Sequence, residues 1–224
     1  VAEFQNRDPR LYATYMYPGL TIIPSTTPYV QKLSTNFTGY HQLKGFNNYS
    51  TDGTVISSVD VAAIRYAEVL LIYAEAAAEL GNVTQSDIDG TIGLLRTRAG
   101  IPSLNMASAN ANPDPVLMAK YPDVTGSNQG LILEIRREKR VEFALEGQRY
   151  NDLLRWHAGT TGFAPYAQGL YFPGLGQYDL TGDGVPDIIL IGSATPIPPD
   201  GSKIVNSLGQ TLIYYKAGSY GDQN

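Results

Sequence analysis

A row of glutamates is the first feature of the sequence that could carry chemistry. Its members recur every four residues: Glu134, Glu138, Glu142 and Glu146. In a helix this spacing places them on one ridge. Such a ridge could supply the acid–base pair of a glycosidase or the carboxylate ligands of a di-iron centre. However, arginine and lysine flank the ridge and would keep every carboxylate ionised, whereas a glycosidase needs one carboxyl group to stay protonated.

The rest of the sequence does not complete a catalytic site around these glutamates. A di-iron bundle uses Glu-x-x-His on two helices, and neither His41 nor His157 follows a glutamate at that spacing. The chain has no cysteine, and it lacks a serine nucleophile elbow, a phosphate-binding loop and a zinc spacing. We therefore interpret the glutamates as buried ion pairs that fix the register of helices, and we expect a protein that is not an enzyme.

An aspartate-rich run is a second candidate site. Four oxygen-bearing side chains alternate around Gly184, as in the first nine positions of a calcium loop: Asp179, Thr181, Asp183 and Asp187. The bidentate glutamate of such a loop is missing, because Leu190 occupies the twelfth position. Two interpretations stay open: a structural calcium ion, with no other cofactor expected, or a turn held by aspartate side chains.

Helical periodicity is strongest from Asp60 to Leu80. Its apolar residues form two neighbouring stripes, which predicts a helix buried on most sides. Gly81 then fits a left-handed C-terminal cap. Within the helix, Arg65 and Glu68 stand one turn apart and are expected to pair with each other.

Four more helices are predicted in the central part of the chain. One runs from Thr84, capped through Asp87, to about Ala99, and its Gly90 and Gly93 suggest close contact with a neighbouring helix. A short helix is expected near Pro115–Tyr121. The last two run from about Ser127 to Leu145 and from Gln148 to His157, separated by Gly147.

The flanking regions read as long loops rich in tyrosine, glycine and proline. The exception is VPDIILIG (Val185–Gly192), a predicted strand that could pair with TLIYY (Thr211–Tyr215). The expected fold is mainly α, with tetratricopeptide-like helical hairpins, long irregular loops and a few short β-strands. Residues 1–58 form a loop-rich segment, 59–157 the helical core and 158–224 a loop-rich tail.

Composition narrows the classes of partner. The net charge of −5 provides no basic surface for nucleic acid. No apolar run reaches the roughly 18 residues of a transmembrane helix. Sixteen tyrosines supply rigid rings with polar tips, which suit sugar recognition.

Four long runs resemble, in the same order, the motifs of the SusD/RagB family of outer-membrane lipoproteins of Bacteroidetes. They are NRDPRLYATYMYPG (Asn6–Gly19), IRYAEVLLIYAEAAAELGN (Ile64–Asn82), LLRTRAGIP (Leu94–Pro102) and EIRREKRVEFALEGQRYNDLLRW (Glu134–Trp156). The resemblance implies a cell-surface protein that captures oligosaccharides and delivers them to a SusC-like TonB-dependent transporter. Family members are about twice this length. We therefore expect these residues to form the C-terminal half of such a protein, with the N-terminal half and its lipid anchor elsewhere.

The resemblance also suggests where a glycan binds. In the family, aromatic residues from loops in this part of the chain help to form the glycan platform. We expect the contacts to come from Tyr15, Tyr17, Tyr40 and Tyr49, helped by Asn47 and Asn48. The alternative for each ring is burial against the helices.

Other functions stay open at this point. A tetratricopeptide-type protein-interaction scaffold would expose its groove to peptides. Some family members import peptides instead of glycans, and a glycoside hydrolase would need an exposed carboxylate pair. The sequence specifies neither the glycan nor whether the binding site is complete in these residues.

Overall fold

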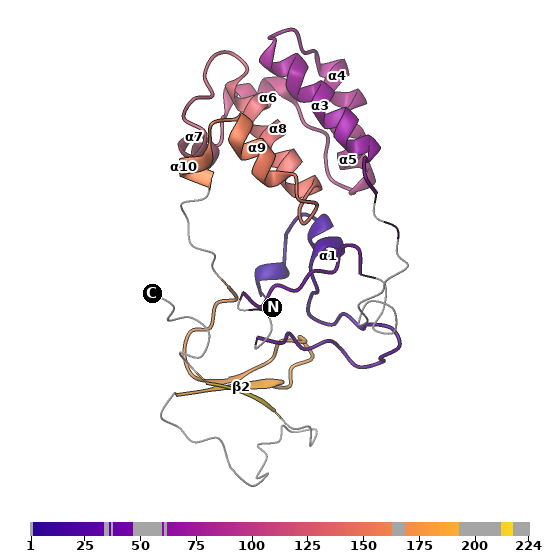
Figure 1. The fold of residues 1–224 in the computed structure, drawn as a ribbon, viewed down its shortest axis with the longest axis vertical. Helices are drawn as coiled ribbons and strands as arrows, with labels where there is room; N and C mark the ends of the chain where they lie inside the picture. The colour runs from indigo at the N-terminus through magenta and orange to yellow at the C-terminus, as the bar shows by residue number, and fades with distance from the viewer. Residues whose placement is uncertain are drawn as a thin grey trace. The chain divides into compact units, whose positions relative to one another are not determined.

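The computed structural model describes residues 2–33, 36, 38–46, 60, 62–162, 169–192 and 212–216 (Figure 1). The chain divides into two compact units. The helical unit comprises Asp8–Arg10 and Asp60–Tyr166. The other, which we call the loop-and-sheet unit, comprises Val1–Arg7, Leu11–Val59 and Ala167–Asn224. The predicted mainly α fold class, with few and short strands, is confirmed.

Helix α3 (Tyr66–Glu79) starts later than the predicted Asp60, because Arg65 is its N-cap and has an extended backbone (φ −110°, ψ 148°). At its other end the predicted cap is confirmed, since Gly81 has a left-handed backbone (φ 74°). The helix buries one face against α8 (Gln129–Glu142). The prediction of burial on most sides is wrong, because large apolar residues of the opposite face are exposed: Tyr66, Val69, Ile72, Tyr73 and, just beyond the helix, Leu80.

The predicted second helix is divided into α4 (Gln85–Gly90) and α5 (Ile92–Arg98). The Thr84–Asp87 capping box is present as predicted. The break falls at Thr91, whose hydroxyl donates to the carbonyl oxygen of Asp87 at 2.6 Å. In a continuous helix that oxygen would accept the backbone N–H of residue 91, so the side chain replaces a bond of the helix at this point.

Helix α8 (Gln129–Glu142) is the centre of the helical unit. It is buried on nearly all sides. Its own buried residues include apolar ones, such as Leu131, Leu133 and Ile135, and also charged ones. Left-handed backbone at Leu145 (φ 65°) and Gly147 (φ 80°) separates it from α9 (Arg149–Arg155). Both helices were predicted, with ends that differ by a few residues.

Three short helices also belong to the described part of this unit: α6 (Met106–Ala111), α7 (Pro115–Lys120) and α10 (Gly159–Gly162). The sequence predicted α7 but not α6. Helix α6 packs so closely on α8 that a Cβ atom at Gly130 would overlap the backbone carbonyl of Ala109. The predicted close contact at Gly90 is wrong, because nothing lies within 4 Å of a Cβ atom there.

A single apolar core joins these helices. Its largest fully buried side chains come from α3, α4, α5, α8 and α9: Leu71, Ile88, Ile92, Leu131, Leu133, Ile135 and Leu153. Burial of each contributes about 1.5–3 kcal/mol. This core positions the charged side chains of α8 described below.

The loop-and-sheet unit contains a 3₁₀ turn (Ala2–Phe4), most of α1 (Arg10–Thr14) and a three-stranded sheet. Strands β1 (Gly176–Tyr178) and β2 (Ile188–Ile191) are antiparallel, and β2 pairs in parallel with β3 (Ile213–Lys216), with Ile188 opposite Ile213. The sequence predicted β2, β3 and their pairing but missed β1. Leu33, Leu180 and Ile188 form the small core of this unit. Within the described residues, no helix has the length and apolarity required to span a bilayer.

Candidate functional site

The two most buried glutamates of α8 are held by arginines from distant parts of the helical unit. Glu142 accepts hydrogen bonds from Arg65 at 2.9 Å and from Arg98 at 2.6 Å, and Arg10 lies 3.2 Å away. Burial raises the pKa of Glu142, but the bonds from Arg98 and Arg65 outweigh it, so its pKa lies below the ordinary value. Glu142 is therefore an ionised structural anion.

Glu138 is bound in the same way, by Arg10 at 2.6 Å and Arg96 at 2.9 Å. The interpretation of the glutamate ridge as buried ion pairs is thus confirmed. The predicted pair of Arg65 with Glu68 is wrong, because Arg65 precedes the helix and has an extended backbone, so the one-turn spacing does not bring the two side chains together.

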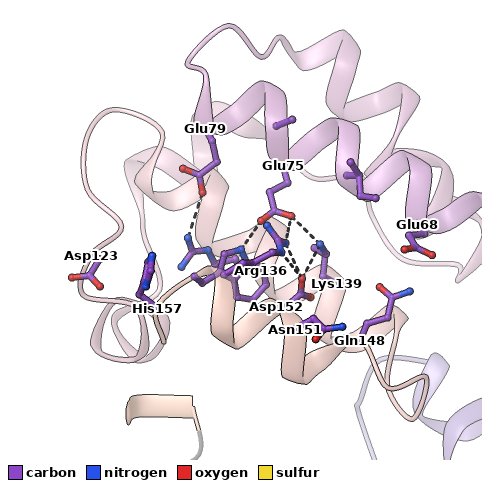
Figure 2. Close-up of a pocket in the computed structure, with 14 residues that line it drawn as sticks. Glu68, Glu75, Glu79, Asp123, Arg136, Lys139, Gln148, Asn151, Asp152 and His157 are labelled. Atoms are coloured by element: carbon purple, nitrogen blue, oxygen red, sulfur yellow. Dashed lines mark hydrogen bonds and ion pairs between the residues drawn. The ribbon is translucent and has the colours of Figure 1, made fainter. Parts of the chain in front are cut away.

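A second ion-pair network surrounds Glu75 of α3 (Figure 2). Its Oε2 atom accepts from Lys139 at 2.9 Å and from Arg155 at 2.5 Å, and its Oε1 accepts the indole N–H of Trp156 at 2.5 Å. Asp152 joins the same two cations, at 3.1 Å and 2.8 Å. Burial raises the pKa of Glu75, but the hydrogen bonds from Arg155 and Lys139 lower it overall.

Neither network has the arrangement of an acid–base catalyst. Each buried carboxylate is matched by two or three cations, whereas a general acid needs surroundings that favour its protonated form. In the part of the chain that the structure describes, no cluster of three His, Cys, Asp or Glu side chains could hold a metal ion.

Five aromatic rings of the loop-and-sheet unit form a continuous row, which we call the tyrosine cluster. In order they are Tyr17, Tyr12, Phe4, Tyr40 and Tyr15, with successive ring centroids 5.0, 6.4, 6.4 and 6.0 Å apart. The rings are tilted or edge-on to one another, as aromatic pairs prefer. Three of the four predicted ligand tyrosines therefore belong to one row: Tyr15 is next to Tyr40, and Tyr17 stands at the opposite end. Each of the three is half-buried, so each combines packing with surface available to a ligand.

Glu3 borders this cluster. Its carboxylate accepts the hydroxyl of Tyr40 and, at 3.2 Å, the backbone N–H of Tyr171. Burial and the bond to Glu3 raise the pKa of Tyr40 to about 12. Tyr40 therefore stays a neutral hydroxyl at physiological pH. Among the described residues, none hydrogen-bonds to the hydroxyls of Tyr15 and Tyr17, which leaves these two groups available to a bound molecule.

A small pocket of about 130 Å³ lies beside Glu3 and Phe4. Residues from the tail form much of its wall, among them Tyr171, Phe172 and Tyr178. The ring of Tyr171 is 78% exposed. Because ligand pockets usually measure 300–1,000 Å³, this one could take a single group of a larger ligand while the rest lies on the surface.

Comparison with protein families assigns the chain to a family. The model of the SusD family matches residues 1–181. The chain belongs to the SusD family. This is a family of glycan-binding proteins of nutrient uptake rather than a family of enzymes. Comparison with curated proteins and with solved structures finds no significant match.

The match to the SusD family does not identify ligand contacts, and the structure leaves some predicted ones undescribed. Tyr49, Asn47 and Asn48 lie outside the described residues. Conversely, sequence reasoning missed Glu3 and Tyr171. Their only local signal was the aromatic pair Tyr171–Phe172 in the tail, and nothing in the sequence connects it to Glu3, far away along the chain.

The predicted calcium residues form the loop between β1 and β2. Asp179 accepts the backbone N–H groups of Gly182 and Gly184, at 2.5 and 2.8 Å. Asp187 accepts those of Leu180 and Thr181, at 2.8 and 2.9 Å. Carboxylates that cap backbone N–H groups in this way hold a turn, and this conformation does not offer them as a set to a cation. A calcium ion here stays a prediction that requires the loop to rearrange.

Proposed function

We propose that this member of the SusD family binds its glycan on the tyrosine cluster, with the exposed ring of Tyr171 extending the surface. The observation that carries the proposal is the continuous row of five rings, which includes Tyr15, Tyr17 and Tyr40 although Tyr40 is distant from the other two in sequence. Aromatic faces match the apolar faces of sugar rings, while hydroxyl and carboxylate groups at the edge can bond to sugar hydroxyls.

Each group in the cluster has a distinct role in this proposal. The half-buried rings of Tyr15 and Tyr17 supply contact area at little entropic cost, since their packing already fixes them. Their hydroxyls bond to the sugar. Glu3 orients Tyr40 through its hydroxyl and keeps an acceptor at the edge of the small pocket. A glycan bound in this way lies mostly on the surface, so recognition depends on several weak contacts along an oligosaccharide.

The biological role follows from the family. We propose that the protein works on the outer face of the outer membrane, held there by a lipid anchor, and passes oligosaccharides to a SusC-like TonB-dependent transporter. The family assignment supports this role. A peptide ligand is the alternative within the same role, and it would use the same tyrosines through their rings and hydroxyls.

The proposal is tested by affinity electrophoresis of the protein in gels that contain one soluble polysaccharide each, with analysis of the same samples for released reducing sugar. We expect retardation by at least one polysaccharide and no released sugar. Released sugar would contradict the non-enzymatic role. Absence of retardation in every gel, followed by absence of heat in calorimetric titrations with oligosaccharides, would reject glycan binding by these residues.

A further inference from the structure

The outer surface of α3 carries an apolar seam with the spacing of a coiled coil. Its residues stand alternately three and four positions apart, which keeps them on one line along the helix: Tyr66, Val69, Tyr73, Ala76 and Leu80. All five are exposed, and the four large ones expose between 53% and 77% of their surface. We call this line the outer seam. The core-facing residues of the same helix, such as Leu71 and Ala74, lie on another face.

Such a seam is unusual at the surface of a stack of helical hairpins. The last helix of a stack normally turns a polar face to water, because a repeat with an apolar outer face needs a neighbour to cover it. Contiguous exposed apolar residues on a folded protein mark a site of interaction. The heptad spacing identifies a helix as the shape that fits.

The charges beside the outer seam specify the partner. Helix α3 contains no lysine or arginine. Glu68 and Glu79 follow one edge of the seam, and Asp87, which accepts the hydroxyl of Tyr73 at 2.9 Å, borders the other. We propose that the outer seam binds an amphipathic helix with apolar residues at heptad spacing and lysine or arginine along both edges.

A groove beside the seam strengthens the charge argument. This pocket of about 680 Å³ runs between α3 and α9 and is lined by Ile72 and Ala76 of α3 (Figure 2). Its acidic lining residues outnumber the basic ones: Glu68, Glu75, Glu79, Asp123 and Asp152 against Arg136, Lys139 and Arg155. The three cations are engaged with Glu75, Asp152 and Glu79. Basic side chains at one edge of the bound helix would therefore enter a groove that is acidic overall.

Two other occupants fit less well. A second copy of this chain would bring its own Glu68 and Glu79 against the same acidic edges, and like charges along a helix pair repel. An anionic membrane surface attracts amphipathic helices with basic edges, which is the opposite of the charge found here.

The test compares two synthetic helices with the same apolar heptad positions, one with lysine and one with glutamate at all flanking positions. Like charges at these positions also keep each peptide from pairing with itself. Binding to the full chain is measured by fluorescence anisotropy. We expect the lysine peptide to bind on the order of tenfold more tightly, from two or three exposed ion pairs. The preference should largely disappear in 1 M salt, where screening is strong.

A matched pair of variants locates the site. Val69→Glu places a charge in the outer seam, and Val116→Glu places the same charge on α7, at a valine that is 73% exposed. Neither change touches the core, so both variants should fold. We expect Val69→Glu to weaken binding of the lysine peptide by about tenfold or more, because it puts a carboxylate in the apolar contact. Val116→Glu should leave the affinity for this peptide unchanged.

Several outcomes would overturn the proposal. One is equal binding of the two peptides at low salt. Another is equal binding to the Val69→Glu and Val116→Glu variants. A third is self-association of the chain in sedimentation that Val69→Glu abolishes, which would assign the outer seam to a second copy. Because no residue of the tyrosine cluster is involved, loss of glycan binding and loss of helix binding are independent results.

Discussion

The guanidinium of Arg65 binds Glu142, with 2.9 Å between Nη1 and Oε1, and not Glu68, its neighbour in sequence. The same guanidinium reaches Glu146, with Nη2 2.8 Å from Oε1. These bonds connect the start of α3 to the end of α8. Local spacing therefore misidentified the partner of Arg65, and the correct one depends on how the helices pack.

Replacement of Glu142 should be costly. In Glu142→Gln the guanidinium groups of Arg10, Arg65 and Arg98 lose a shared, nearly inaccessible carboxylate. Breaking a buried ion pair on one side costs about 3–5 kcal/mol. We expect a decrease of that order in the free energy of unfolding, measured with urea. The control is Glu68→Gln, which should change it by less than about 0.5 kcal/mol. Equal effects of the two variants would contradict this ion-pair assignment.

Acid should destabilise the helical unit through Glu75 and Glu142. The pKa of each is lower in the folded protein than the ordinary value of 4.5. A depressed pKa stabilises the fold above the ordinary pKa, and this contribution is lost as the pH falls through the folded-state pKa. We expect constant stability between about pH 6 and 7 and a decline that begins near pH 4.5 and continues below it.

The single tryptophan offers a direct probe of this loss. Trp156 donates its indole N–H to Glu75, so its fluorescence should change as Glu75 becomes protonated. The variant Glu75→Gln should lack this change at acid pH. A change of the same size in the variant would show that another group controls the fluorescence.

Substitution of two glycines by alanine should have opposite effects on stability, because one glycine is closely packed and the other is not. Gly130→Ala forces a Cβ atom into the backbone of α6 at Ala109, and backbone cannot move aside as a side chain can. We expect a loss of about 1–3 kcal/mol, as for other overpacked sites. Gly90→Ala adds a methyl group where nothing lies within 4 Å and should stabilise the protein by up to about 1 kcal/mol. Thermal unfolding measured side by side checks both, and a reversed order would contradict the contact between α6 and α8.

Thermal melting with and without calcium can show whether the loop between β1 and β2 is a turn or a calcium site. With the carboxylates of Asp179 and Asp187 engaged by backbone N–H groups, we expect equal melting temperatures in calcium and in EGTA. We also expect Asp187→Asn to lower the melting temperature in both. If calcium raises the melting temperature, and this increase is absent in Asp179→Asn, the predicted calcium site would be established instead.

The ring of Tyr171 can be removed without damage to the fold, because it is 78% exposed. Tyr171→Ala should weaken glycan binding on the order of tenfold, from the loss of one stacked ring. Tyr66→Ala, at a ring that is 70% exposed in the helical unit, is the matched control and should bind as the unchanged protein does. If the two variants bind the glycan with equal affinity, Tyr171 is not part of the binding site.

Signals contained within a few residues predicted local structure well. The box formed by Thr84 and Asp87, the cap at Gly81 and the strand that became β2 are all fixed by neighbours in sequence. The density of charge in α8 also predicted buried ion pairs correctly, because apolar residues on the same helix require burial.

Features that depend on packing could not be predicted in this way. Two apolar faces on α3 suggested burial on both, yet whether the outer one is covered depends on a partner that the sequence does not name. Helix α6 carries no buried residue and so lacks the periodicity that reveals helices. Glu3 and Tyr171 come together only because the N-terminal residues and the tail pack against each other in the loop-and-sheet unit.

Glycan binding by the tyrosine cluster can be tested by comparing two triple variants. Affinity for the polysaccharide that retards the protein is measured for a triple variant with alanine at Tyr15, Tyr17 and Tyr40, after circular dichroism confirms that it is folded. The control carries alanine at three exposed tyrosines of the helical unit: Tyr66, Tyr73 and Tyr150. We predict that the first variant loses retardation and the control retains it. If the folded first variant is retarded as strongly as the control, the glycan binds elsewhere.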